Sequence, residues 1–171
     1  MRTLAFIAAI SLVLAAAPGL AHARPERGFG NQLYQDLTGR CLDVVDRRGD
    51  DGAPVQRWDC GLQSNRQWLF TDPAAGSWSI RPRSATDKCL DVKDGRRGTG
   101  TLVQIWACNS GGQQRWTVDR TSGTGREMLR AAFAPALCLG IDGNGDRNGG
   151  RAGVWACEAP TTLFYVTPAG I

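Results

Sequence analysis

The chain has 171 residues, of which 20 are lysine or arginine and 16 are aspartate or glutamate, so its formal net charge is +4. The length fits one domain, and 42% apolar with 21% charged residues is an ordinary globular composition, which excludes a disordered tail or a fibre. The basic residues are scattered and their excess is small, so composition gives no support for a nucleic-acid partner. An enzyme, a binding module and a small secreted scaffold remain open.

The first 23 residues have the layout of a secretory signal peptide. Arg2 is followed by an uncharged run from Leu4 to Ala17, and Ala21-His22-Ala23 has the small-residue pattern of a cleavage site. The alternative is a membrane anchor, but the run of about 14 apolar residues is shorter than the roughly 20 that a spanning helix needs. We therefore expect residues 1–23 to be removed and residues 24–171 to form a secreted domain, extracellular or periplasmic, that does not span a membrane.

The single histidine of the sequence, His22, lies inside the expected signal peptide. A mature chain without imidazole has no Ser-His-Asp or Cys-His nucleophile and no histidine-ligated zinc or copper site. Its only glutamates are Glu26, Glu127 and Glu158, so a glycosidase with paired carboxylates would depend mostly on aspartates. We expect no catalytic residue, no metal site and no cofactor.

Three segments of the chain repeat one cysteine pattern. Each segment has two cysteines 19 positions apart, and the first cysteines follow one another after 48 and 49 residues. Six cysteines permit 15 pairings, and the repeat favours the one that treats the segments alike: Cys41–Cys60, Cys89–Cys108 and Cys138–Cys157. Export would allow disulfides, whereas thiolate metal binding lacks a Cys-x-x-Cys spacing. Each bridge would contribute about 3 kcal/mol by closing a loop of about 20 residues.

Short apolar runs between clusters of glycine, aspartate, asparagine and arginine predict strands joined by turns. One unit of this size cannot bury its own apolar face, so three units are expected to share one core around a pseudo-threefold axis. The repeats span approximately residues 30–75, 76–123 and 124–168, and their closing aromatics, Trp68, Trp116 and Phe164, are expected in that core. About twelve strands are expected, near residues 32–36, 41–45, 54–58, 67–71, 77–82, 89–92, 102–106, 115–119, 128–132, 138–141, 153–157 and 163–167.

These motifs resemble the ricin B-type lectin family, also grouped as carbohydrate-binding module family 13. The first two repeats each contain Cys-Leu-Asp-Val, a Gln-x-Trp-x-Cys segment and a close similar to Asn-Gln-x-Trp, beginning at Cys41 and Cys89. The third repeat, beginning at Cys138, keeps the cysteines and the aromatic residues. The resemblance extends roughly from Gln32 to Pro168 and implies an all-β fold, a β-trefoil, with one disulfide and one potential sugar pocket in each repeat.

In that family an aspartate, a glutamine, an aromatic residue and the closing amides form the pocket. An ionised carboxylate can accept hydrogen bonds from two hydroxyls, an aromatic ring can lie against the C–H face of a sugar, and an amide can donate and accept. The alternative roles are turn capping for the aspartates and packing on the disulfides for the tryptophans. The resemblance assigns the pockets to Asp43, Gln56, Trp58 and Asn65, and to Asp91, Gln104, Trp106, Gln113 and Gln114.

The repeats depart from the family pattern in ways that bear on function. Arg66 replaces a glutamine and cannot accept a hydrogen bond, and Gln113 replaces an asparagine with a side chain one methylene longer. In the third repeat Gly140, Gly153 and Thr161-Thr162 stand at the positions of the polar ligands. We expect the first and second pockets to be competent and the third to be inactive towards the usual sugars.

The resemblance implies a non-catalytic, lectin-like module whose partners are glycans or polysaccharides. The alternative is a protein-interaction trefoil, an inhibitor or a toxin accessory subunit, that has lost sugar binding, because fold does not fix function. A further motif, Asp142-Gly143-Asn144-Gly145-Asp146, is similar to the start of a calcium loop. Arg147 and Gly153 stand where an EF-hand needs glycine and glutamate, which favours a solvated turn.

Overall fold

The computed structural model describes residues 30–35, 38–120, 126–142, 147–162 and 164–168, and these residues contain strands and short 3-10 turns but no α-helix. The expected signal peptide lies outside the described residues. All of the strands expected from the sequence are present, with ends that differ by a few residues at most. Their bounds are β1 (Gly30–Gln35), β2 (Cys41–Val44), β3 (Ala53–Trp58), β4 (Trp68–Ala74), β5 (Ser77–Pro82), β6 (Lys88–Val92), β7 (Thr101–Ala107), β8 (Trp116–Arg120), β9 (Glu127–Ala131), β10 (Leu137–Ile141), β11 (Ala152–Ala156) and β12 (Phe164–Pro168).

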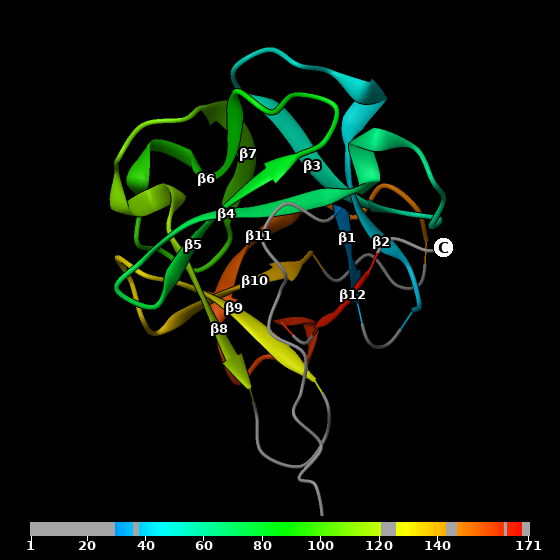
Figure 1. The fold of residues 1–171 in the computed structure, drawn as a ribbon. Helices are drawn as coiled ribbons and strands as arrows, with labels where there is room; N and C mark the ends of the chain where they lie inside the picture. The colour runs from blue at the N-terminus through cyan, green and yellow to red at the C-terminus, as the bar shows by residue number, and fades with distance from the viewer. Residues whose placement is uncertain (1–29, 36–37, 121–125, 143–146, 163, 169–171) are drawn as a thin grey trace, which may run out of the picture.

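Six of the strands form a closed ring of antiparallel pairs. β1 pairs with β4, β4 with β5, β5 with β8, β8 with β9, and β9 with β12. β12 then pairs with β1, and Figure 1 shows these blue and red strands side by side. Closing the ring pairs backbone groups that an open sheet edge would leave without partners. In the described part of the chain, no helix is long and apolar enough to cross a membrane.

The other six strands form three hairpins, β2–β3, β6–β7 and β10–β11. The hairpins meet through the pairs β3–β7 and β7–β11 and through a bridge between Gln56 and Arg151. The same order of four strands therefore recurs three times, as expected for a β-trefoil. The register is also the same in each hairpin, with Cys41 opposite Trp58, Cys89 opposite Trp106 and Cys138 opposite Trp155.

The core contains the closing aromatic residue of every repeat. Trp68 and Trp116 are fully buried and Phe164 is 1% exposed, which confirms the core position predicted for them. The indole Nε1 of Trp68 donates to the carbonyl oxygen of Leu42 at 2.9 Å, and Nε1 of Trp116 donates to that of Leu90 at 3.0 Å. Each buried indole N–H therefore has an acceptor, which a large amphipathic ring needs inside a core.

Three disulfides join the ends of the hairpins. The bonds are Cys41–Cys60, Cys89–Cys108 and Cys138–Cys157, which confirms the pairing expected from the repeat. Each bond connects the first strand of a hairpin to the residues that follow its second strand. The tryptophan opposite the first cysteine therefore lies at the disulfide-bonded end of each hairpin.

Candidate functional site

The hairpin register brings the predicted aspartate, glutamine and tryptophan of each of the first two repeats onto one face. In the second repeat Asp91 on β6 lies opposite Gln104 on β7, and Trp106 comes two residues after Gln104. Side chains two residues apart on a strand point to the same face. The first repeat has the same arrangement, with Asp43 on β2 opposite Gln56 on β3. Each of these two hairpins thus carries an aspartate–glutamine pair and a tryptophan ring on the same face.

Two neutral amides hold the carboxylate of Asp91. Gln104 Nε2 donates to Asp91 Oδ1 at 3.1 Å, and Gln114 Nε2 donates to Asp91 Oδ2 at 3.0 Å. Gln114 is itself fixed, because its Oε1 accepts from the backbone N–H of Asn109 and its Nε2 also donates to the carbonyl of Ala107. A carboxylate has about four acceptor positions. Each oxygen of Asp91 therefore keeps one position that no described residue uses.

Asp91 lies at the wall of a cavity of about 210 Å³, which Trp106 also lines. Trp106 is 42% exposed, so part of its ring surface is open to a ligand, whereas Asp91 is only 4% exposed. Burial raises the pKa of the Asp91 carboxyl above its ordinary value, although the hydrogen bonds from Gln104 and Gln114 act in the opposite direction. The remaining lining residues are Asp94, Gly95, Gln104, Asn109 and Gln113.

In the first repeat, Asp43 has a charged partner as well as amides. Gln56 Nε2 donates to Asp43 Oδ2 at 2.8 Å, and Asn65 Nδ2 donates to Asp43 Oδ1 at 2.6 Å. Arg66 Nε donates to the same Oδ1 at 2.9 Å and forms an ion pair with it. Three donors therefore occupy the carboxylate, and both acceptor positions of Oδ1 are used. Trp58, at 36% exposure, is nearly as accessible as Trp106.

The closing 3-10 turns explain the difference between the two pockets. Arg66 ends the turn Ser64–Arg66, and Gln114 ends the equivalent turn Gly112–Gln114, so both reach the aspartate of their own repeat from the same position. One residue earlier, Asn65 contacts Asp43, but Gln113 turns instead towards Asn109, with 3.4 Å from its Nε2 to Asn109 Oδ1. The longer side chain of Gln113 thus lines the cavity without contacting the carboxylate.

Trp155 fills the corresponding space in the third repeat. Gly140 on β10 lies opposite Gly153 on β11, where the other repeats have aspartate and glutamine. A Cβ atom added at Gly140 would lie 3.1 Å from Trp155 Cε3, and one added at Gly153 would lie 2.6 Å from Trp155 Cη2. These separations are too short for an aspartate and a glutamine to fit beside Trp155 in its present place. The two glycines let the indole pack against the hairpin itself.

Three residues that line the second cavity, Asp94, Gly95 and Asn109, were not predicted from the sequence. Asn109 follows Cys108 directly, and the corresponding residues of the other repeats are Gly61 and Glu158. Comparing these three positions in the sequence could have identified Asn109, because only the second repeat has an amide there. Asp94 also lines the cavity, and its carboxylate pairs with Arg96 at 3.3 Å. Among the described residues, no group of three or more histidine, cysteine, aspartate or glutamate side chains could hold a metal ion.

Comparison with known proteins gives the family of this chain. Over 43 residues the chain is 50% identical to a ribosome-inactivating protein from Polygonatum multiflorum, a match that covers 25% of this chain and only 7% of that protein. A designed threefold-symmetric protein, ThreeFoil, has a TM-score of 0.75 at 22% identity, covering 81% of this chain and 97% of the designed chain. The ricin B-like lectin of Macrolepiota procera in complex with lactose has a TM-score of 0.70 at 16% identity, covering 85% and 99%. At such identities the two structures show the fold alone. The family model of the ricin-type beta-trefoil lectin domain matches residues 30–162, and the chain therefore belongs to that family.

Proposed function

We propose that this protein binds carbohydrate without catalysing a reaction, and that the cavity around Asp91 is its principal sugar site. Membership of the ricin-type lectin domain family supports carbohydrate binding as the general activity. One observation carries the choice of site: each oxygen of Asp91 keeps an acceptor position that none of the described residues uses, and Trp106 lines the same cavity. Asp43 in the first repeat does not offer the same pair of positions.

The chemistry of the cavity suits two neighbouring hydroxyl groups of a pyranose ring. One hydroxyl would donate to each oxygen of Asp91, which is the bidentate acceptance that an ionised carboxylate allows. The exposed part of Trp106 would lie against the apolar C–H face of the ring. The amides of Asn109 and Gln113 can donate to or accept from further hydroxyls. We expect a single shallow site of this kind to bind in the millimolar range, about −4 kcal/mol.

The three repeats would contribute unequally to binding. The first repeat, with Asp43, Gln56, Trp58 and Asn65, would be a weaker site because Arg66 neutralises and occupies its carboxylate. The third repeat would not bind sugar in this way, because Trp155 packs over Gly140 and Gly153. Two sites on one rigid domain would still gain avidity on a polysaccharide.

We also infer that the protein is exported. The uncharged run from Leu4 to Ala17 with the Ala21-His22-Ala23 pattern supports cleavage after Ala23. The three disulfides support an oxidising compartment.

A variant of Asp91 tests the proposed function. Asp91→Asn keeps the shape of the side chain, removes its charge and replaces one acceptor oxygen by a donor. We expect affinity for the bound glycan to fall about tenfold or more, since hydrogen bonds to charged groups contribute about 1.5–3 kcal/mol. The matched control is Asp87→Asn. Asp87 is exposed, lies just before β6, forms an ion pair with Lys88 and does not line the cavity.

The possible results distinguish a wrong site assignment from a wrong proposed function. Unchanged affinity in Asp91→Asn, with the wild type still binding, would contradict the assigned site. No binding of the wild type to any member of a broad glycan and polysaccharide array would contradict carbohydrate binding and favour the protein-interaction trefoil.

A further inference from the structure

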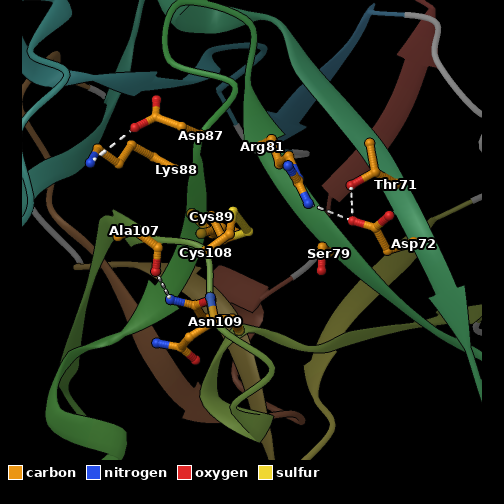
Figure 2. Close-up of a disulfide and its surroundings, with 12 residues drawn as sticks. Thr71, Asp72, Ser79, Arg81, Asp87, Lys88, Cys89, Ala107, Cys108 and Asn109 are labelled. Atoms are coloured by element: carbon orange, nitrogen blue, oxygen red, sulfur yellow. Dashed lines mark hydrogen bonds and ion pairs between the residues drawn. A yellow bond between two sulfur atoms is a disulfide. The ribbon is translucent and has the colours of Figure 1, made fainter.

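A second and larger hollow adjoins the Asp91 cavity. It has a volume of about 520 Å³, within the range of small-molecule sites. The hairpin β4–β5 contributes Asp72, Ser79 and Arg81 to its wall, and Arg115 precedes β8. Asn109 lines both this hollow and the Asp91 cavity, so the two share a wall. Figure 2 shows the side chains from β4 and β5 across a gap from Asn109 and the Cys89–Cys108 disulfide. We call this second hollow the arginine groove.

An irregularity in the β4–β5 hairpin shapes the arginine groove. The strand register shifts between Thr71 and Ala74, and Asp72 within this bulge has a φ of 49°, which is uncommon for a residue with a side chain. Asp72 Oδ2 accepts from Thr71 Oγ1 at 3.0 Å and from Arg81 Nη2 at 2.6 Å, and these interactions are drawn in Figure 2. The hydrogen bond from Thr71, with the Arg81 contact and the charge of Arg115, holds the pKa of Asp72 below its ordinary value.

Arg115 supplies a fixed positive charge that has no carboxylate contact in the described part of the chain. Its Nε donates to Ser77 Oγ at 3.1 Å and its Nη1 to Ser79 Oγ at 2.9 Å. Its Nη2 donates to the backbone carbonyls of Asp72 at 2.6 Å and Ser77 at 2.8 Å. All four acceptors are uncharged oxygens. With Arg81 paired to Asp72, the groove carries two guanidinium groups against one carboxylate, and its net charge is positive.

The Asp91 cavity has the opposite electrostatic character. Asp91 and Asp94 line it, and none of its lining residues is lysine or arginine. The amides that hold Asp91 are neutral, so an anionic group placed there would face the buried carboxylate without a cation between them. A ligand that carries both hydroxyls and an acid group would therefore place the hydroxyls in the cavity and the acid group in the arginine groove.

We propose that the cavity and the arginine groove form one extended site for an acidic oligosaccharide, with hydroxyls of one unit on Asp91 and the carboxylate of a neighbouring uronic acid unit beside Arg81 and Arg115. The inference rests on the proposed function, because it takes the Asp91 cavity as a sugar site. Arg81 uses one N–H of Nη1 for the carbonyl of Thr86 and one of Nη2 for Asp72. Each terminal nitrogen of Arg81 thus keeps one N–H for a ligand carboxylate.

Uronic acid oligosaccharides and their methyl esters provide a matched pair of probes, because esterification removes the charge and keeps the sugar skeleton. We would titrate the protein with tetrasaccharides of galacturonate and of glucuronate, each as the free acid and as the methyl ester. The wild type should bind at least one free acid about fivefold more tightly than its ester at low salt, the effect of an exposed ion pair. Added salt should reduce this preference.

Two variants test the arginine groove in different ways. Arg81→Gln removes a positive charge from the groove, and Ser110→Asp adds a negative charge at an exposed residue of its wall. Both should abolish the preference for the free acid and leave affinity for the ester within about twofold. The matched control is Arg83→Gln, since Arg83 is exposed, lies two residues after Arg81 and lines neither hollow.

The outcomes distinguish this inference from the proposed function. Equal or absent binding of acid and ester by the wild type, or a preference that persists in both groove variants, would overturn the extended site. Binding of neutral glycans that is lost in Asp91→Asn would leave the proposed function intact in that case. Ester binding that survives in Asp91→Asn would instead contradict the assignment of the cavity.

Discussion

Arg66 Nε lies 2.9 Å from Asp43 Oδ1, at the position from which Gln114 contacts Asp91 in the next repeat. This difference separates two pockets that share the same hairpin register. The carboxylate of Asp43 is paired with a cation and receives three donors, whereas that of Asp91 receives two neutral donors. A carboxylate that is neutralised and largely occupied is a poorer acceptor for sugar hydroxyls.

Replacing Arg66 with glutamine should therefore strengthen sugar binding by the first repeat. The change removes the positive charge that neutralises Asp43, so the carboxylate becomes a stronger acceptor for sugar hydroxyls, and a gain of about 1 kcal/mol corresponds to an affinity gain of about fivefold. The measurement is calorimetric titration of Arg66→Gln in an Asp91→Asn background, so that the first repeat is observed alone.

The reciprocal variant is the control for this prediction. Gln114→Arg in an Asp43→Asn background should weaken binding by the second repeat by a similar factor, because the arginine would pair with Asp91. Unchanged or lower affinity in Arg66→Gln would show that the ion pair with Asp43 does not limit the first pocket.

Sugar binding by the second repeat should decrease in mild acid. Burial raises the pKa of Asp91, and a protonated carboxyl has lost its charge and one acceptor position. The affinity for sugar is expected to be highest at neutral pH and to fall as the pH drops through this raised pKa. The fall should begin above the pH of about 4 at which an exposed aspartate titrates. Titrations between pH 4 and pH 7 test this, and constant affinity over that range would contradict it.

The negative charge of Asp91, which favours sugar binding, should oppose folding. Because the pKa of Asp91 is higher in the folded protein than in the unfolded chain, ionisation of Asp91 opposes folding as the pH rises through the folded-state pKa. The favourable contribution of the protonated group is complete below the unfolded-state pKa and is lost above the folded-state pKa. Between pH 4 and pH 7 the free energy of unfolding, measured with urea, should therefore fall less in Asp91→Asn than in the wild type. An equal fall in both proteins would contradict this prediction.

Replacing Trp116 with phenylalanine should destabilise the fold by about 2–4 kcal/mol. The hydrogen bond from the indole N–H to the carbonyl of Leu90 would be lost, and the smaller ring would leave a void in the core. Denaturant unfolding gives the free-energy difference. Trp78→Phe is the control and should cost clearly less, since Trp78 is only partly buried and its indole N–H donates to no residue in the described part of the chain. Equal losses would show that the Leu90 hydrogen bond contributes little.

The fold was predictable because the repeat constrains it three times. Cysteines at a constant separation of 19 residues gave the disulfide pairing, and the equivalent places of Trp68, Trp116 and Phe164 marked the core. A slip in register would have to recur in every repeat to remain consistent with that pattern. Local strand signals that are weak one at a time therefore become strong together.

The details of the candidate site depend on side-chain reach, which the sequence pattern does not specify. The sequence indicated an altered contact at Arg66, but the ion pair with Asp43 requires the turn and the carboxylate to lie within one side-chain length. The packing of Trp155 over two glycines is likewise a matter of the space between strands. The arginine groove depends on a bulge between Thr71 and Ala74, a local irregularity without a counterpart in the repeat pattern.

The most direct test of the central claim is an NMR titration that follows the indole N–H signals of the six tryptophans while a neutral glycan selected on the array is added. If the cavity around Asp91 is the principal sugar site, the Trp106 signal should shift most and saturate, Trp155 should stay in place, and the Trp106 shift should disappear in Asp91→Asn. A glycan that shifts Trp58 or Trp155 to saturation while Trp106 remains unchanged would contradict the claim.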